Sequence, residues 1–283
     1  MRKVHARWTY LAAGCAFVAL LVVLLVRVSL SGDELSDERA HLVLRNALAV
    51  ANPDYEIAFD WARGSWKRTE RGRELSMAFS EQGSGPEAHT TWTDALVLSH
   101  SGDVRLPVIP RSRMAAALEE FGAPARAGGA GESSALLKEL PDGLQVEGVV
   151  ELRAPLDLMA LRGLWTTNID VFLLSGARPQ GKPLSWDTGA VYCGSRGFDT
   201  CAAGTTGRVP ATEQFRRWVS LLREDDRPYL ERVGLELSEL RAAADEAKVH
   251  GWAMTASPGT FRALARDPRV RRVSVVSVTP EDG

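Results

Sequence analysis

The segment VHGWAMTASPGTFRALARDPRVRRVSVVSV, residues 249–278, predicts a strand, a helix and a second strand in succession. Apolar residues alternate through its first and last parts, which is typical of half-buried strands. Ser257 and Pro258 suit the N-cap and first turn of a helix, because proline lacks only a hydrogen bond that this position would not make. Phe261 and Leu264 are spaced to lie on the buried face of that helix.

The same order of elements occurs once before. Residues 144–152 predict a strand, Pro155 opens a short helix that contains Leu158 and Leu161, and residues 169–174 form a strongly apolar strand. Two such units predict an α+β, ferredoxin-like split β-α-β domain with both helices on one face of an antiparallel sheet.

This predicted domain covers residues 135–283 and carries an insertion at about 176–246. Within the insertion, apolar residues at helical spacing predict amphipathic helices over residues 211–223 and 230–247.

Residues 249–278 resemble the β-α-β half of a ferredoxin-like domain of the subtilase propeptide or inhibitor type. The resemblance runs from His250 to Val276 and is carried by Leu264, Asp267, Pro268, Val270 and Val273. That family uses the domain as an intramolecular chaperone and protease inhibitor. The resemblance covers about a tenth of the chain. It implies the fold and, as an alternative function, a protease-inhibitor-like domain.

An antiparallel α+β region is predicted over residues 33–121. Ser36 suits a helix N-cap, and the helix ends at Asn52-Pro53. Alternating residues predict strands over 55–61 and 75–79, joined into a long hairpin by a turn. Further predicted elements are strands over 91–99 and 104–109 and a helix over 113–121. The segment GAPARAGGAGESS, residues 122–134, predicts a linker or long loop.

The N-terminus predicts a single membrane span over residues 8–28. The run from Trp8 to Val26 carries no charge, and as a helix it would be roughly 28 Å long, about the thickness of the hydrocarbon core. Basic residues lie within residues 1–7, and acidic ones follow the run. The positive-inside rule therefore predicts a cytoplasmic tail of residues 1–7 and a single-pass cell-membrane protein with an extracytoplasmic C-terminus. Arginine far outnumbers lysine, a bias typical of high-GC bacterial genomes.

Two other interpretations of the N-terminus stay open. Ser29 and Ser31 are small residues in a weak cleavage pattern, so the segment could be a signal peptide. The residues before Cys15 resemble a loose lipobox, which would favour lipidation at Cys15. The alternative for Cys15 is packing as a small apolar residue within the membrane helix.

Cys193 and Cys201 are the two cysteines outside the predicted span. In an oxidising compartment such a close pair predicts a disulfide. Metal binding is the alternative, but the neighbouring sequence supplies neither a histidine nor a third thiol. The pattern therefore favours the disulfide.

No catalytic, cofactor or metal motif is recognisable in the sequence. The five histidines are not at metal-ligand spacing, and HExxH and phosphate-binding glycine loops are missing. Ser99-His100-Ser101-Gly102-Asp103 holds the residue types of a triad consecutively, which is typical of a polar turn instead. A formal net charge of −2 gives no electrostatic argument for nucleic acid.

Two surface features remain as candidate binding sites. The first is a basic hairpin tip that could bind phospholipid headgroups or an anionic wall polymer; it comprises Arg63, Trp66, Lys67, Arg68, Arg71 and Arg73. The alternative is a solvated hairpin with its tryptophans in the core. The second is a disulfide-closed loop whose residue types suit a protein contact; it comprises Trp186, Tyr192, Arg196 and Phe198. Its alternative is an ordinary surface loop.

These features predict a membrane-anchored extracytoplasmic binding or regulatory module, a protein-interaction subunit at the cell envelope. The short cytoplasmic tail leaves room for little else on the inner side. The alternatives are a protease-inhibitor-like domain and an envelope hydrolase with an unrecognised site. Perturbed carboxylates around Asp170, Asp187 or Asp199 would favour the hydrolase.

Overall fold

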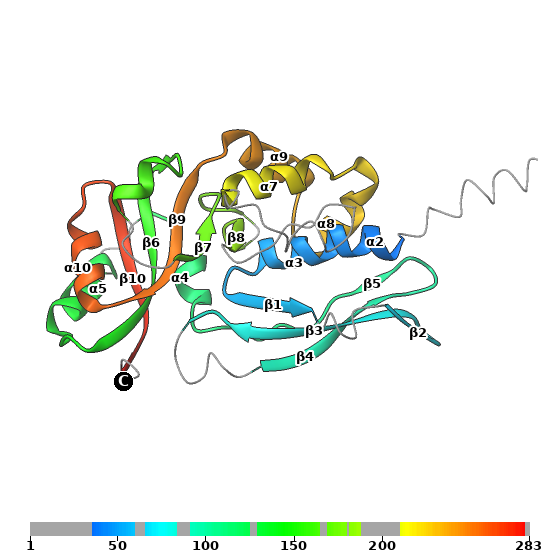
Figure 1. The fold of residues 1–283 in the computed structure, drawn as a ribbon, viewed down its shortest axis with the longest axis horizontal. Coiled ribbons are helices and arrows are strands. Elements are labelled where there is room, and N and C mark those ends of the chain that lie inside the picture. Colours follow the sequence, from blue (N-terminus) through cyan, green and yellow to red (C-terminus); the bar gives the residue numbers. More distant parts are fainter. Residues whose placement is uncertain are drawn as a thin grey trace, which may run out of the picture.

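A computed structural model describes residues 36–59, 66–83, 91–124, 129–164, 169–179, 181–187 and 210–280. The fold is α+β, with two antiparallel sheets and several helices (Figure 1). We call the sheets the N-terminal sheet and the C-terminal sheet. The predicted span and the cytoplasmic tail lie outside the described residues. Among the helices that the structure describes, none is long and apolar enough to cross a bilayer.

The first helical segment runs from Asp37 to Ala51. It consists of α2 (Asp37–Ala40), a π-helical turn η1 (His41–Arg45) and α3 (Asn46–Ala51). Ser36 is the N-cap, as predicted, because its Oγ accepts a hydrogen bond from the Arg39 backbone N–H at 3.2 Å. Within the π-helical turn, the Leu42 carbonyl accepts a bond from Trp218 Nε1 at 2.9 Å. This irregular turn therefore ties the segment to the helices of the insertion.

The N-terminal sheet has the strand order β1-β3-β4-β5, and β2 pairs with β3. Its strands are β1 (Tyr55–Phe59), β2 (Lys67–Thr69), β3 (Gly72–Glu81), β4 (Thr91–Leu98) and β5 (Val104–Arg105). The long hairpin is confirmed, since β1 pairs antiparallel with β3. Leu75, Met77 and Phe79 alternate along β3 and are buried against the first helical segment.

The structure corrects the interpretation of the segment before β3 as a plain turn. Residues Lys67–Thr69 form β2, and Thr69 pairs with Gly72, so the reversal takes only Glu70 and Arg71. Thr69 Oγ1 supports this tight turn by accepting a bond from the Arg71 backbone N–H at 3.3 Å. The polar sequence hid the strand, because β2 has no alternating apolar pattern.

Two short helices connect the sheets, α4 (Ala115–Glu119) and α5 (Gly129–Glu139). The structure differs here from the expected linker, because residues 129–134 lie in α5. Leu137 anchors this helix in the core with a relative exposure of only 1%. The low complexity of the segment concealed a helix whose only large apolar residues, Leu136 and Leu137, come near its end.

The C-terminal sheet has the strand order β10-β6-β9-β7-β8, with every neighbouring pair antiparallel. Its strands are β6 (Leu144–Leu156), β7 (Ile169–Leu173), β8 (Ser185–Asp187), β9 (Val249–Ala256) and β10 (Val270–Pro280). Helix α10 (Pro258–Arg266) joins β9 to β10. Ser257 caps it and Pro258 begins it, both as predicted.

The helix expected after Pro155 is reduced to a single 3-10 turn. Strand β6 continues through Pro155 to Leu156, and η3 (Ala160–Gly163) is the only helical turn before β7 in the residues described there. Leu161 and Leu164 are nevertheless buried against the sheet. Strand β6 takes up Pro155 and Leu156, with which the expected helix would have begun.

In the described part of the insertion, the helical segments are α7 (Ala211–Ser220), η4 (Glu224–Asp226), α8 (Arg227–Arg232) and α9 (Leu237–Glu246). The helix expected over residues 230–247 is therefore two helices. Gly234 separates them in a left-handed conformation, with φ of +77°. The Leu235 backbone N–H reaches back to the Leu230 carbonyl at 3.0 Å, which closes the end of α8.

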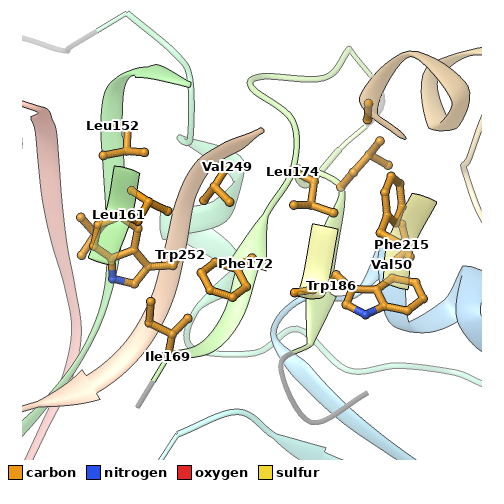
Figure 2. Packing of buried hydrophobic residues seen from close by; sticks show 14 of the residues in the cluster. Val50, Leu152, Leu161, Ile169, Phe172, Leu174, Trp186, Phe215, Val249 and Trp252 are labelled. Carbon is orange, nitrogen blue, oxygen red and sulfur yellow. The ribbon is translucent and has the colours of Figure 1, made fainter. Parts of the chain in front are cut away.

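The elements are arranged along one long axis. In Figure 1 the C-terminal sheet lies at the left with α10 and α5, while β2 and the start of α2 lie at the right end. The insertion helices lie above the first helical segment in this view. One large apolar core runs from the C-terminal sheet into the insertion helices. Figure 2 shows Trp252 with Leu161 at one end of this core and Trp186 with Phe215 at the other.

Gly251 tests the close pairing of β9 with β6. A Cβ atom at this position would lie 2.2 Å from the Val150 carbonyl oxygen and 2.7 Å from the Phe121 ring. We expect Gly251→Ala to destabilise the protein by roughly 1–3 kcal/mol, because the sheet must shift to admit a methyl group. Urea unfolding of the full-length protein measures this.

Gly259→Ala is the matched control. Gly259 lies in the first turn of α10, and its Cβ would be 3.7 Å from the nearest atom. This substitution should be neutral or slightly stabilising. Equal unfolding midpoints for the two variants would contradict the packing described for β9.

Candidate functional site

A row of polar side chains crosses the C-terminal sheet, one from each strand. In strand order the row comprises Ser277, Glu147, Thr255, Asp170 and Asp187; we call it the polar row. Ser277 pairs with Glu147, and Glu147 pairs with Thr255 in the sheet register. The Thr255 backbone N–H donates to the Asp170 carboxylate. Asp187 lies opposite Val171, the residue after Asp170.

Glu147 is the most buried member of the polar row, with 4% exposure. Ser277 Oγ donates to its Oε2 at 2.8 Å. The chain just after β3 lies close to the carboxylate, since a Cβ atom at Gly83 would lie 2.6 Å from Glu147 Oε1. Burial raises the pKa of Glu147, and the Ser277 hydrogen bond and the charge of Arg113 oppose that rise.

Asp170 is the member of the polar row whose pKa is raised close to neutral pH. Burial raises its pKa to about 6, and the negative charges of Asp187 and Glu147 act in the same direction. The bond from Thr255 N–H opposes the rise but does not cancel it. A carboxyl group with this pKa changes protonation near neutral pH and can act as a general acid or base.

Thr255 adds a second unusual group to the polar row. Its Oγ1 atom is buried and has no hydrogen-bond partner among the described residues. Buried hydroxyl groups are normally paired, so Thr255 is an exception within the polar row. Asp199, which the sequence placed with Asp170 and Asp187, lies outside the described residues.

Asp54 forms a separate buried cluster that is structural. Lys182 Nζ donates to both of its carboxylate oxygens at 2.6 Å, and Ser112 Oγ donates to Oδ2. Ser112 Oγ also accepts the Ala115 backbone N–H at the start of α4. Because the serine and the lysine both bind Asp54, the cluster pins three chain segments together and is not arranged as a nucleophile with its base.

The structure separates the predicted basic hairpin into buried and exposed members. Trp66 is only 7% exposed, and its Nε1 donates to the Asp37 carbonyl at 3.2 Å. Arg73 stacks 5.8 Å above the Trp66 ring and forms an ion pair with Asp37. Lys67, Arg68 and Arg71 are exposed. Arg63 lies outside the described residues. Trp66 therefore packs in the core, and the exposed members of the hairpin are the cations Lys67, Arg68 and Arg71.

Trp186, expected at a partner contact, is a core residue. It is 3% exposed, and its ring lies 5.7 Å from that of Phe215 and 5.8 Å from that of Trp218 (Figure 2). Its side chain is thus not on the surface that a partner could touch. Strand β8 ends just before residue 188 and helix α7 begins just after residue 209, and Trp186 and Phe215 bring these two elements into contact. Tyr192, Cys193, Arg196, Phe198 and Cys201 all lie outside the described residues.

Sequence reasoning overlooked Glu147 and the polar row. A usable signal existed, because Glu147 interrupts an apolar strand, and an acidic residue there needs a partner or a raised pKa. Within the part of the chain that the structure describes, no three His, Cys, Asp or Glu side chains are arranged to hold a metal ion.

Comparison with known proteins found no match for this chain among family models, curated proteins or solved structures. The resemblance of residues 249–278 to subtilase propeptide domains therefore remains a prediction.

The raised pKa of Asp170 predicts a pH-dependent stability. The folded state binds a proton more tightly than the unfolded state, so this group contributes stability at low pH that is lost as the pH rises from about 4 to about 6. A rise of this size corresponds to about 3 kcal/mol at most. We expect Asp170→Asn to be more stable than wild type at pH 8 and to lose that advantage at pH 4.

Thermal or urea unfolding at both pH values measures the difference. Asp245→Asn, which removes an exposed carboxylate on α9, is the control and should show no such change. An Asp170→Asn difference that is the same at both pH values would contradict the assignment.

Proposed function

We propose that this chain is a membrane-anchored extracytoplasmic binding module, a protein-interaction subunit at the cell envelope. The predicted span over residues 8–28 supplies the anchor. The loop of residues 188–209, with Arg196 and Phe198, supplies the contact surface.

The fold that we propose for residues 135–283 is a ferredoxin-like split β-α-β domain with an insertion. The strand order β10-β6-β9-β7 supports it. Strands β6 and β7 of the first unit lie on either side of β9, and strands β9 and β10 of the second unit lie on either side of β6, as in a split β-α-β sheet. The reduction of the first helix to η3 and the added edge strand β8 are departures from the simplest form. Modules of this kind carry many functions, so the fold alone does not assign one.

The observation that carries the proposal is the packing of the two elements that flank residues 188–209. Strand β8 ends at Asp187 and α7 begins at Ala211, and the aromatic cluster of Trp186, Phe215 and Trp218 joins the two ends. Ser185 Oγ also bonds to the Val50 carbonyl at 3.1 Å, which ties β8 to the first helical segment. Recognition residues are commonly placed on loops held by such a scaffold.

The residue types within the loop agree with this role. Arginine and aromatic side chains contribute most of the binding energy at protein interfaces. The predicted Cys193–Cys201 disulfide would lower the entropy that the loop loses on binding. Strand β8, after which these residues follow, is the edge strand of the C-terminal sheet, away from the helices α10 and α5 in Figure 1.

The experiment is in-cell crosslinking of the full-length protein, followed by purification and mass spectrometry. We expect Arg196→Ala and Phe198→Ala each to reduce capture of one envelope protein at least tenfold, a loss of roughly 1.4 kcal/mol or more. Arg266→Ala, an exposed cation on α10, is the control and should capture normally. Undiminished capture by both loop variants would show that the loop is not the contact.

The polar row favours a second candidate, an envelope hydrolase. Asp170 with a pKa of about 6 could activate water as a general base, and the buried Thr255 hydroxyl could bind a polar substrate group. We expect any hydrolytic activity to fall by about 10²-fold or more in Asp170→Asn, and to follow the titration of Asp170 in the wild type. Activity that is unchanged in this variant across pH would remove the candidate.

A further inference from the structure

The hairpin turn between β2 and β3 is fixed beside the start of α2. Two contacts hold it there, the hydrogen bond from Trp66 Nε1 to the Asp37 carbonyl and the ion pair of Arg73 with Asp37. Figure 1 shows β2 and α2 together at the right end of the long axis. The turn is thus placed at the same end of the molecule as Ser36 and Asp37, where the described part of the chain begins.

The turn carries a small excess of positive charge: Lys67, Arg68 and Arg71 stand against Glu70 in the turn and Glu74, which lies opposite Lys67 in the register of β2 and β3. Lys67, Arg68 and Arg71 are exposed, and within the part of the chain that the structure describes none of them has an ion-pair partner. Glu70 is the one acidic residue in the turn itself. Asp37, the nearest acid on α2, is already paired with Arg73. Many other surface arginines are in ion pairs, for example Arg216 and Arg217, which share Glu213.

The anchor brings a bilayer within reach of this turn. Asp37 follows the predicted end of the span at residue 28 by nine residues, which extend to about 30 Å at most. The turn lies on the side of the molecule to which this tether leads. Exposed cations held near an anionic bilayer are attracted to its headgroups, over a range set by a Debye length of about 8 Å at physiological salt.

We propose that Lys67, Arg68 and Arg71 bind anionic phospholipid headgroups of the bilayer that holds the chain. The inference rests on the proposed membrane anchor. The contact is electrostatic, because Trp66 is packed in the core and its ring is not available for insertion into lipid. Its consequence is orientation: the N-terminal sheet lies against the membrane and the C-terminal sheet is carried away from it.

The test is lysine labelling of the full-length protein in nanodiscs with a water-soluble acetylating reagent, read by mass spectrometry. Lys67 is the reporter. Lys138, exposed on α5 at the opposite end of the molecule in Figure 1, is the internal reference. Nanodiscs of phosphatidylcholine alone are compared with nanodiscs that also contain phosphatidylglycerol.

We expect labelling of Lys67 relative to Lys138 to fall about fivefold in the anionic nanodiscs and to recover at about 0.5 M NaCl. Arg68→Gln/Arg71→Gln should lose most of this protection. Arg153→Gln/Arg266→Gln removes two exposed cations elsewhere and should keep it.

Equal labelling of Lys67 in both nanodiscs would overturn the proposal, as would protection that survives Arg68→Gln/Arg71→Gln. A failure of the anchor itself has a different signature, because the chain would then not purify with nanodiscs of either composition. If the proposed protein contact is wrong, the crosslinking experiment with the loop variants shows it, and the protection of Lys67 in nanodiscs is unaffected.

Discussion

The first helical segment, residues 37–51, is buried on two sides, and the rest of the structure depends on this constraint. One side packs on the N-terminal sheet through Ala40, Leu44 and Leu48. The other side enters the large core of the C-terminal sheet and the insertion through Val43, Ala47 and Val50. A helix that is apolar around most of its circumference needs partners on both sides, so neither sheet can complete its core without it.

Polar contacts reinforce the same junction. Arg39 forms an ion pair with the buried Asp226 and also bonds to the Leu221 carbonyl at 2.9 Å. The Asp54 cluster joins the turn before β1 to the segment before β8 through Lys182. Because removal of one partner from a buried ion pair leaves an uncompensated charge, these contacts fix the relative position of the joined segments. The two proposed contact regions, the basic turn and the loop base at β8, are held by one framework as a result.

Local signals in the sequence predicted the elements well, whereas long-range arrangement was out of reach. The caps at Ser36 and Ser257 and the alternation in β3 and β9 depend on near neighbours, so they were readable. Strand β2 and helix α5 were missed, because each lacks a sustained apolar period and is stabilised by tertiary packing. The break at Gly234 was also readable in principle from glycine's preference for left-handed conformations.

In the candidate sites, too, the residue types could be identified from the sequence and their spatial arrangement could not. The polar row joins residues far apart in the chain, such as Glu147 and Ser277, and only the sheet register brings them together. Trp186 and Trp66 had residue types typical of contacts, but their side chains fill the core, a distinction that composition cannot make. The basic turn was visible in the sequence, while its position beside α2 came from the structure.

The most direct test of this account is native-state hydrogen exchange of the full-length protein with Leu44→Ala. Leu44 belongs to the apolar cluster of the N-terminal sheet, and its truncation should cost about 2–5 kcal/mol. If the shared helix makes the molecule one cooperative unit, the slowest amides of β3 and of β6 and β9 will all exchange faster by the same factor. Faster exchange in β3 alone, with β6 and β9 unchanged, would contradict it and show that the two sheets unfold independently.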